Sequence, residues 1–171
     1  MLETCATADE ARRSLSDAPQ YYETVPCHYI IADRGGDSFV WSHAARPGRP
    51  IRIDGSRDKP LAITNHIPDP VIAEGPPRME SIERLTRLCA AVDASGERPG
   101  LDAIRRSATT VAATLPPGAG QYRAASPTRT LWHAFYDLQD CSVEMDFYLG
   151  DEQNGTIRRS TPRRFTIRRN P

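Results

Sequence analysis

Two pairs of strand-like segments dominate the pattern of apolar and polar residues. Segments 28–33 and 38–43 contain several β-branched and aromatic residues, and the Arg-Gly-Gly-Asp sequence between them (34–37) is typical of a hairpin turn. Segments 130–137 and 142–149 flank a four-residue turn, and in the second of these apolar odd positions alternate with polar even positions. The pattern therefore predicts two antiparallel hairpins. Shorter strands are expected at 51–53, 61–64 and 164–167.

Helical periodicity marks two short segments. Thr7 and Glu10 have the spacing of a capping box, and the apolar residues that follow predict a short amphipathic helix that Pro19 ends. Another helix is predicted over 101–115, where apolar residues recur every three or four positions until two prolines stop the pattern.

A longer helix is predicted over 79–92. Its apolar residues lie along one stripe; they are Met79, Ile82, Leu85, Leu88, Cys89 and Val92. Arg84 lies on the flank of this stripe, whereas Arg87 lies opposite it. The helix is therefore expected to bury one face and to expose Arg87.

The order of elements favours an α+β fold with mainly antiparallel sheets. Helix, strands, two helices and strands follow one another, without regular βαβ repeats. A length of 171 residues suits one globular domain, so 1–171 is expected to form a single domain. The proline-rich stretches 68–77 and 116–127 are interpreted as loops within it, because neither is long or biased enough to be an independent linker.

The charge balance limits the classes of binding partner, and the cysteines and hydrophobicity indicate the cellular compartment. The chain has 22 basic and 22 acidic residues, so no overall field favours nucleic acid or a membrane surface as a partner. No apolar run approaches the roughly 20 residues of a transmembrane helix, and no signal peptide is recognised. These features predict a cytoplasmic protein with reduced and mostly buried cysteines. The cysteines are Cys5, Cys27, Cys89 and Cys141.

The arginine-rich end of the chain has two interpretations. Its arginines are Arg158, Arg159, Arg163, Arg164, Arg168 and Arg169. Such a cluster would suit an anionic partner. A charged edge strand that discourages edge-to-edge pairing is favoured, because Phe165 is the only aromatic residue among the arginines.

Short motifs of common enzyme classes are absent. The sequence has no nucleophile elbow, no phosphate-binding loop, no dinucleotide-binding glycine motif and no zinc-protease helix motif. The four histidines form no short pair of metal ligands; they are His28, His43, His66 and His133. No metal and no cofactor are therefore predicted. Asp54 and Asp58 are interpreted as part of a solvated turn rather than a calcium loop, and Asn154-Gly155 as a turn between strands.

Five segments, in order along the chain, resemble a known enzyme family. They are Met1-Leu-Glu-Thr-Cys-Ala-Thr-Ala-Asp-Glu-Ala11, His28-Tyr-Ile-Ile-Ala-Asp33-Arg-Gly-Gly36-Asp-Ser38, Leu61-Ala-Ile-Thr64-Asn65-His66, Ser81-Ile82-Glu83-Arg84 and Thr130-Leu-Trp-His-Ala-Phe-Tyr-Asp137. Each is similar to a segment of the choloylglycine hydrolases and isopenicillin-N acyltransferase-like enzymes, which are linear amide C–N hydrolases with an N-terminal nucleophile (Ntn hydrolases). The resemblance covers only the C-terminal part of the family fold. It implies that this α+β chain is part of an Ntn-hydrolase αββα sandwich.

The function that this resemblance implies depends on a nucleophile. The family cleaves linear non-peptide amide bonds, or transfers the acyl group, with an N-terminal cysteine whose own α-amino group acts as the base. That cysteine begins a strand in the half of the family fold to which this chain has no counterpart. Cys5 precedes a predicted helix instead, so a packing role is favoured for it.

The chain is therefore expected to be an inactive C-terminal fragment of such a hydrolase or acyltransferase. Its longer parent would take a small-molecule amide substrate, which the sequence does not specify, and oligomer formation is left open. The alternative is a non-catalytic remnant or a pseudoenzyme binding module. Loss of part of the sandwich would leave apolar strand faces uncovered, so the isolated chain is expected to aggregate or to bind hydrophobic dyes.

Two catalytic residues are implied by the resemblance. Asn65 corresponds to the family's asparagine that helps hold the reacting carbonyl oxygen, and Arg84 to its arginine near the nucleophile. The alternatives are an asparagine that caps a strand end and an arginine that merely extends from a helix flank. If the correspondence holds, Asn65 and Arg84 point into one cleft while Arg87 faces solvent. Ser42 stands where the family's hairpin usually carries glutamate.

Overall fold

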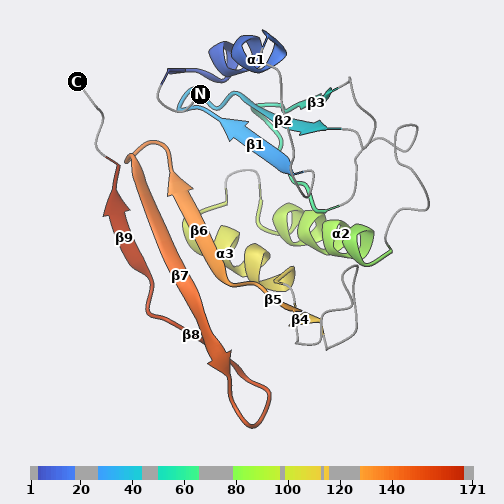
Figure 1. Cartoon of the computed structure of the whole chain (residues 1–171), viewed down its shortest axis with the longest axis vertical. Coiled ribbons are helices and arrows are strands. Elements are labelled where there is room, and N and C mark those ends of the chain that lie inside the picture. Colours follow the sequence, from blue (N-terminus) through green and yellow to red (C-terminus); the bar gives the residue numbers. More distant parts are fainter. Residues whose placement is uncertain are drawn as a thin grey trace. The chain divides into compact units, whose positions relative to one another are not determined.

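The structure, a computed structural model, has an α+β fold with antiparallel sheets, as the sequence predicts (Figure 1). It describes residues 4–17, 27–43, 50–65, 79–96, 99–112, 114–115 and 128–167. The chain divides into two compact units, Met1–Arg98 and Pro99–Pro171. None of the helices within the described residues is long and apolar enough to cross a membrane.

The first unit contains two helices and a three-stranded sheet. Its elements are α1 (Ala8–Asp17), β1 (His28–Ala32), β2 (Ser38–His43), β3 (Pro50–Asp54) and α2 (Met79–Asp93). The sheet order is β1-β2-β3, and both strand pairs are antiparallel. Helix α1 packs on the sheet through a small apolar core formed by Ala8, Ala11, Phe39 and Trp41, with Cys5, Leu15 and Ile31 at its edge.

The capping box predicted at the start of α1 is confirmed. The backbone N–H of Glu10 donates to Thr7 Oγ1 (3.2 Å), and the N–H of Thr7 donates to Glu10 Oε2 (3.3 Å). Each side chain therefore satisfies a backbone group that the first helical turn leaves without an internal partner.

Two details of the first unit differ from the sequence prediction. Residues 61–64 form no strand, and Thr64 bonds to helix α2 instead of to a neighbouring strand. Cys89, placed in the buried stripe of α2, is exposed, whereas Ser81 is only 2% exposed. The buried face of α2 is turned towards Ser81 because the serine hydroxyl has a polar partner in Thr64, which apolar periodicity does not detect.

The second unit consists of one helix, a four-stranded sheet and a short strand pair. Its elements are α3 (Leu101–Thr110), β4 (Thr114–Leu115), β5 (Thr128–Arg129), β6 (Trp132–Asp137), β7 (Ser142–Asp151), β8 (Ile157–Arg159) and β9 (Arg163–Thr166). Strands β6 and β7 form the predicted hairpin, with Asp137 opposite Ser142. Strands β8 and β9 both pair with β7, and β4 pairs with β5. All of these pairs are antiparallel.

Local sequence explains how the elements of the second unit end. Helix α3 stops at Thr110, before the predicted end at residue 115, because β-branched residues at 109–111 have low helix propensity. The Asn154-Gly155 turn between β7 and β8 is confirmed, since Gly155 has φ +82° and Asn154 Oδ1 accepts the N–H of Thr156 (2.8 Å). Cys141, with φ +49°, ends the β6–β7 turn in the left-handed region.

The four-stranded sheet has two faces of opposite character. Cross-strand partners share a face, so β6, β7 and β9 form an apolar sheet face. We define this face by Trp132, Ala134, Tyr136, Val143, Met145, Phe147, Leu149 and Phe165. The other face carries Phe135, Glu144 and Asp146, and Arg105 of α3 contacts both Glu144 and the Phe135 ring. Helix α3 therefore lies on the face with the charged residues.

Candidate functional site

Asn65 and Arg84 meet in the structure, although 18 residues separate them in the sequence. The Arg84 Nη2 donates a hydrogen bond to Asn65 Oδ1 at 2.5 Å. Asn65 is exposed and Arg84 is half-buried. Arg87, one helical turn further along α2, is exposed as predicted. The predicted proximity of Asn65 and Arg84 and the outward position of Arg87 are therefore confirmed, whereas the common cleft expected around the pair stays a prediction.

A second contact fixes the backbone beneath this pair. Thr64 Oγ1 donates to the carbonyl oxygen of Ser81 (2.8 Å), and Ser81 Oγ donates to Thr64 Oγ1 (3.0 Å). Ser81 and Arg84 lie three residues apart in the first turns of α2, which places them on one side of the helix. The Thr-Asn sequence and the S-x-x-R sequence thus form one four-residue contact between a loop and a helix start.

The chemistry of arginine determines how the Asn65 amide is oriented. A guanidinium group has only hydrogen-bond donors, so the atom of Asn65 that faces Arg84 is the acceptor Oδ1. The Nδ2 group, with two N–H donors, is on the other side of the amide. Asn65 is exposed, so its side-chain amide is accessible to solvent.

Cys5 lies in a position suited to packing. It precedes α1 and is half-buried against the core formed by α1 and β2. Its sulfur lies 3.8 Å from Thr4 Oγ1. The prediction that the cysteines are mostly buried is wrong: Cys27 and Cys89 are exposed, and Cys5 and Cys141 are half-buried. Cys89 differs because α2 turns its Ser81 side inward, and Cys141 because it occupies a turn.

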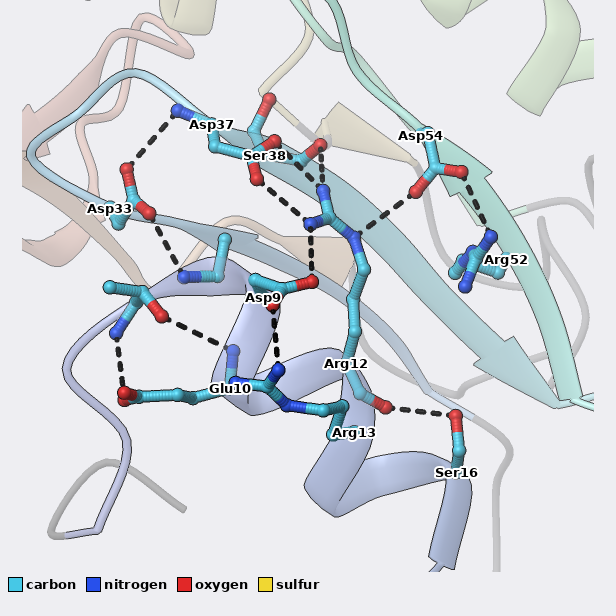
Figure 2. Close-up of polar contacts among 12 residues, drawn as sticks. Asp9, Glu10, Arg12, Arg13, Ser16, Asp33, Asp37, Ser38, Arg52 and Asp54 are labelled. Atoms are coloured by element: carbon cyan, nitrogen blue, oxygen red, sulfur yellow. Dashed lines mark hydrogen bonds and ion pairs between the residues drawn. The ribbon is translucent and has the colours of Figure 1, made fainter.

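Arg12 is the centre of an ion-pair cluster that sequence reasoning missed. Its Nη1 and Nη2 atoms donate to the two carboxylate oxygens of Asp37, both at 2.8 Å, and its Nε donates to Asp54 Oδ1 at 3.2 Å (Figure 2). The guanidinium also lies 4.8 Å from the centre of the Phe39 ring. Arg12 therefore joins α1 to the β1–β2 turn and to the end of β3.

A signal for this cluster was present in the sequence. The inward positions of α1 are 8, 11, 12 and 15, the spacing of a single helix face, and arginine occupies one of them. A charged residue within an apolar stripe needs a partner of opposite charge. The acidic residues of the hairpin turn provide that partner.

Asp33 gives the hairpin motif its structural role. Its Oδ2 accepts the N–H of Ala8 at the start of α1 (3.0 Å), and its Oδ1 accepts the N–H of Asp37 across the turn (3.1 Å) (Figure 2). The hydrogen bond from Ala8 lowers the pKa of Asp33 below its ordinary value. The hydrogen bond from Arg12 likewise lowers the pKa of Asp37. Asp33 and Asp37 therefore hold α1 on the hairpin.

Ser42 and His28 form a cross-strand contact in the same sheet. His28 Nδ1 lies 2.7 Å from Ser42 Oγ, and the two residues are register partners. Ser42 is fully buried. A glutamate at this position would bring a charge into the sheet, so serine preserves a hydrogen bond there without that charge.

The arginines of the C-terminal strands serve different local contacts. Arg159 pairs with Asp146 and also donates to the carbonyl oxygen of Thr130, whereas Arg164 bonds to Asp140 and Ser142. Arg168 and Arg169 lie outside the described residues. These ion pairs support the interpretation of a charged strand region rather than a shared anion site.

Two comparisons with known proteins found no match. No protein-family model matches the chain, and no curated protein matches it. Functional interpretation therefore rests on the contacts of Asn65 and Arg84 and on the resemblance of the five sequence segments.

Proposed function

We propose that this chain carries the carbonyl-binding part of an amide C–N hydrolase or acyltransferase site. In this proposal, Asn65 donates hydrogen bonds from Nδ2 to the oxygen that becomes negatively charged when an amide carbonyl is attacked. Arg84 is a positioning residue that holds the other end of the Asn65 amide. The observation that carries the proposal is the 2.5 Å hydrogen bond from Arg84 to Asn65.

The arrangement suits this chemistry for two physical reasons. A donor that stabilises an oxyanion must be oriented before the charge develops, because reorienting it during the reaction would cost free energy. Arg84 supplies that orientation, and the Thr64–Ser81 contact fixes the backbone on both sides of the pair. The guanidinium also withdraws electron density from the amide, which makes the Nδ2 hydrogens better donors.

The nucleophile belongs to another part of the proposed site. Acyl transfer in the resembling family requires a cysteine at the first residue of a strand. Cys5 is followed by helix α1 and packs against the core. The proposed active protein therefore combines this chain with a cysteine-led strand, and a small-molecule linear amide is its substrate.

The carbonyl-binding role can be tested on the chain without any turnover. Methyl methylphosphonate is a tetrahedral monoanion that resembles the intermediate, and its binding can be followed through the side-chain amide signals of Asn65 in ¹⁵N NMR. We expect these signals to shift on titration in the wild type and in Arg87→Ala, and not to shift in Arg84→Ala. Arg84→Lys should recover part of the shift. Equal shifts in wild type and Arg84→Ala would contradict the proposed role of Arg84, and no Asn65 shift in any variant would contradict the site.

The proposal that the nucleophile heads a separate strand can be tested by reading the coding sequence upstream of Met1. If that sequence encodes an in-frame strand headed by cysteine, the longer protein should hydrolyse linear amides. Asn65→Ala should then lower its kcat by about 100- to 1000-fold with a smaller change in KM. An upstream sequence without such a strand would favour the alternative of a non-catalytic binding module.

A further inference from the structure

We propose that the apolar sheet face of β6, β7 and β9 is a homodimer interface that binds the same face of a second copy of this chain. The proposal concerns the second unit only. It uses no residue of the Asn65–Arg84 contact and does not depend on the proposed function.

Large apolar side chains on this face remain exposed. Trp132 is 57% exposed, Tyr136 62% and Phe147 42%, and Leu149 and Phe165 are about equally accessible. These five side chains alone present roughly 500–600 Å² of accessible surface, if a free aromatic side chain presents about 200 Å². This matches the largest apolar patches of monomers, about 300–600 Å². With the adjoining strand atoms it approaches the roughly 600–800 Å² that each partner contributes to a stable pair.

The opposite, charged face of the sheet already contacts helix α3. Glu144 is paired with Arg105 of α3, and Asp146 is paired with Arg159 and His133. The Arg105–Glu144 pair holds the charged face against α3, because separating it would leave two partly buried charges without a partner. Helix α3 therefore lies on the charged face, and the proposed partner binds the apolar face.

Charge distribution favours a second copy as that partner. Within the part of the face formed by β6, β9 and residues 143–147 of β7, the only charged position is Arg163, which is paired in register with Met145. Met145 is in turn paired with Ala134 on β6. Apart from Arg163 this part of the face is uncharged, so it complements the same apolar surface of another copy, and a two-fold axis makes one patch serve both partners.

The direction of the axis follows from Arg163. A two-fold axis parallel to β7 places β9 of one copy over β6 of the other. Arg163 of each copy then lies over Ala134 of its partner, in the space between Trp132 and Tyr136. A guanidinium above aromatic faces is favourable, and this arrangement keeps the two Arg163 side chains apart. Two twisted sheets pack face to face in this way at about 10 Å.

The test measures the mass of the chain in solution by analytical ultracentrifugation over a range of concentrations. We expect a dimer for the wild type at micromolar concentration. Phe147→Glu should raise the dissociation constant at least 100-fold, since it places a charge at the centre of the interface. Arg163→Ala should raise it about threefold to tenfold. Ile104→Glu is the matched control, because Ile104 is 46% exposed on α3 and should leave the dimer unchanged.

Tryptophan quenching provides a second measurement on the unaltered chain. Trp41 is 3% exposed and Trp132 is 57% exposed. In a monomer, acrylamide should therefore quench the fluorescence of Trp132 strongly and that of Trp41 weakly. In a dimer, it should quench the fluorescence of both tryptophans weakly. Circular dichroism melting establishes that each variant is folded. A wild-type monomer at tens of micromolar, a dimer that Phe147→Glu leaves intact, or open-ended aggregates in place of a dimer would each overturn the proposal.

Discussion

Replacing Arg12 by alanine should loosen the attachment of helix α1 to its sheet. The Arg12 side chain is 15% exposed and binds Asp37 through two hydrogen bonds, while it also contacts Asp54 and the Phe39 ring. Arg13 is the natural control, because it is 69% exposed and pairs with the exposed Asp9. The two substitutions change the same residue type, at adjacent positions of one helix.

The expected magnitudes follow from burial. A hydrogen bond to a charged group contributes about 1.5–3 kcal/mol when shielded, but partial exposure of the partners of Arg12 reduces this. Together with the aromatic contact, we expect Arg12→Ala to lower the free energy of unfolding by about 2 kcal/mol. Arg13→Ala should change it by less than about 0.5 kcal/mol, as is usual for exposed pairs.

Urea unfolding followed by tryptophan fluorescence measures the difference. In a Trp132→Phe background Trp41 is the only tryptophan, and because it is buried in the core beneath α1 its emission reports on the first unit. In high salt the effect of Arg13→Ala should vanish and most of the effect of Arg12→Ala should persist. If Arg12→Ala costs no more than Arg13→Ala, the reasoning that α1 is held by the Arg12 cluster is refuted.

Three further predictions address pH, packing and catalysis. The pKa of Asp33 is lowered in the folded state, so its stabilising effect is complete above the unfolded pKa and is lost as the pH falls through the folded pKa. The stability of the first unit should therefore decline as the pH falls below about 5, and Asp33→Asn should flatten this decline in urea titrations. Gly55→Ala should destabilise the same unit by about 1–3 kcal/mol in thermal melts, because the new Cβ would lie 2.9 Å from the carbonyl oxygen of Ser38. Gly100→Ala is the control: its Cβ would meet no atom within 4 Å, so this substitution should be tolerated. The purified chain should not hydrolyse linear amides in an amine-release assay; turnover that Cys5→Ala abolishes would contradict the packing role of Cys5.

Local sequence patterns determined most of the elements and their turns. The Thr7–Glu10 capping box, both hairpins and the Asn154-Gly155 turn depend on residues close together in the chain, so spacing and turn chemistry are sufficient to predict them. The fold class follows from the order of these elements. The resemblance of short segments also singled out Asn65 and Arg84, which the structure brings into contact.

Tertiary contacts decided which faces are buried. Apolar periodicity placed Cys89 inside, yet the hydroxyl pair of Thr64 and Ser81 turns α2 so that Ser81 is buried and Cys89 is exposed. The alternation in β7 separates apolar from polar positions, but it does not predict which face of the sheet a helix covers. In the structure, the ion pair between Arg105 and Glu144 places helix α3 on the charged face. Such pairings join residues far apart in the chain, and their energies depend on distance and burial, which only the folded chain defines.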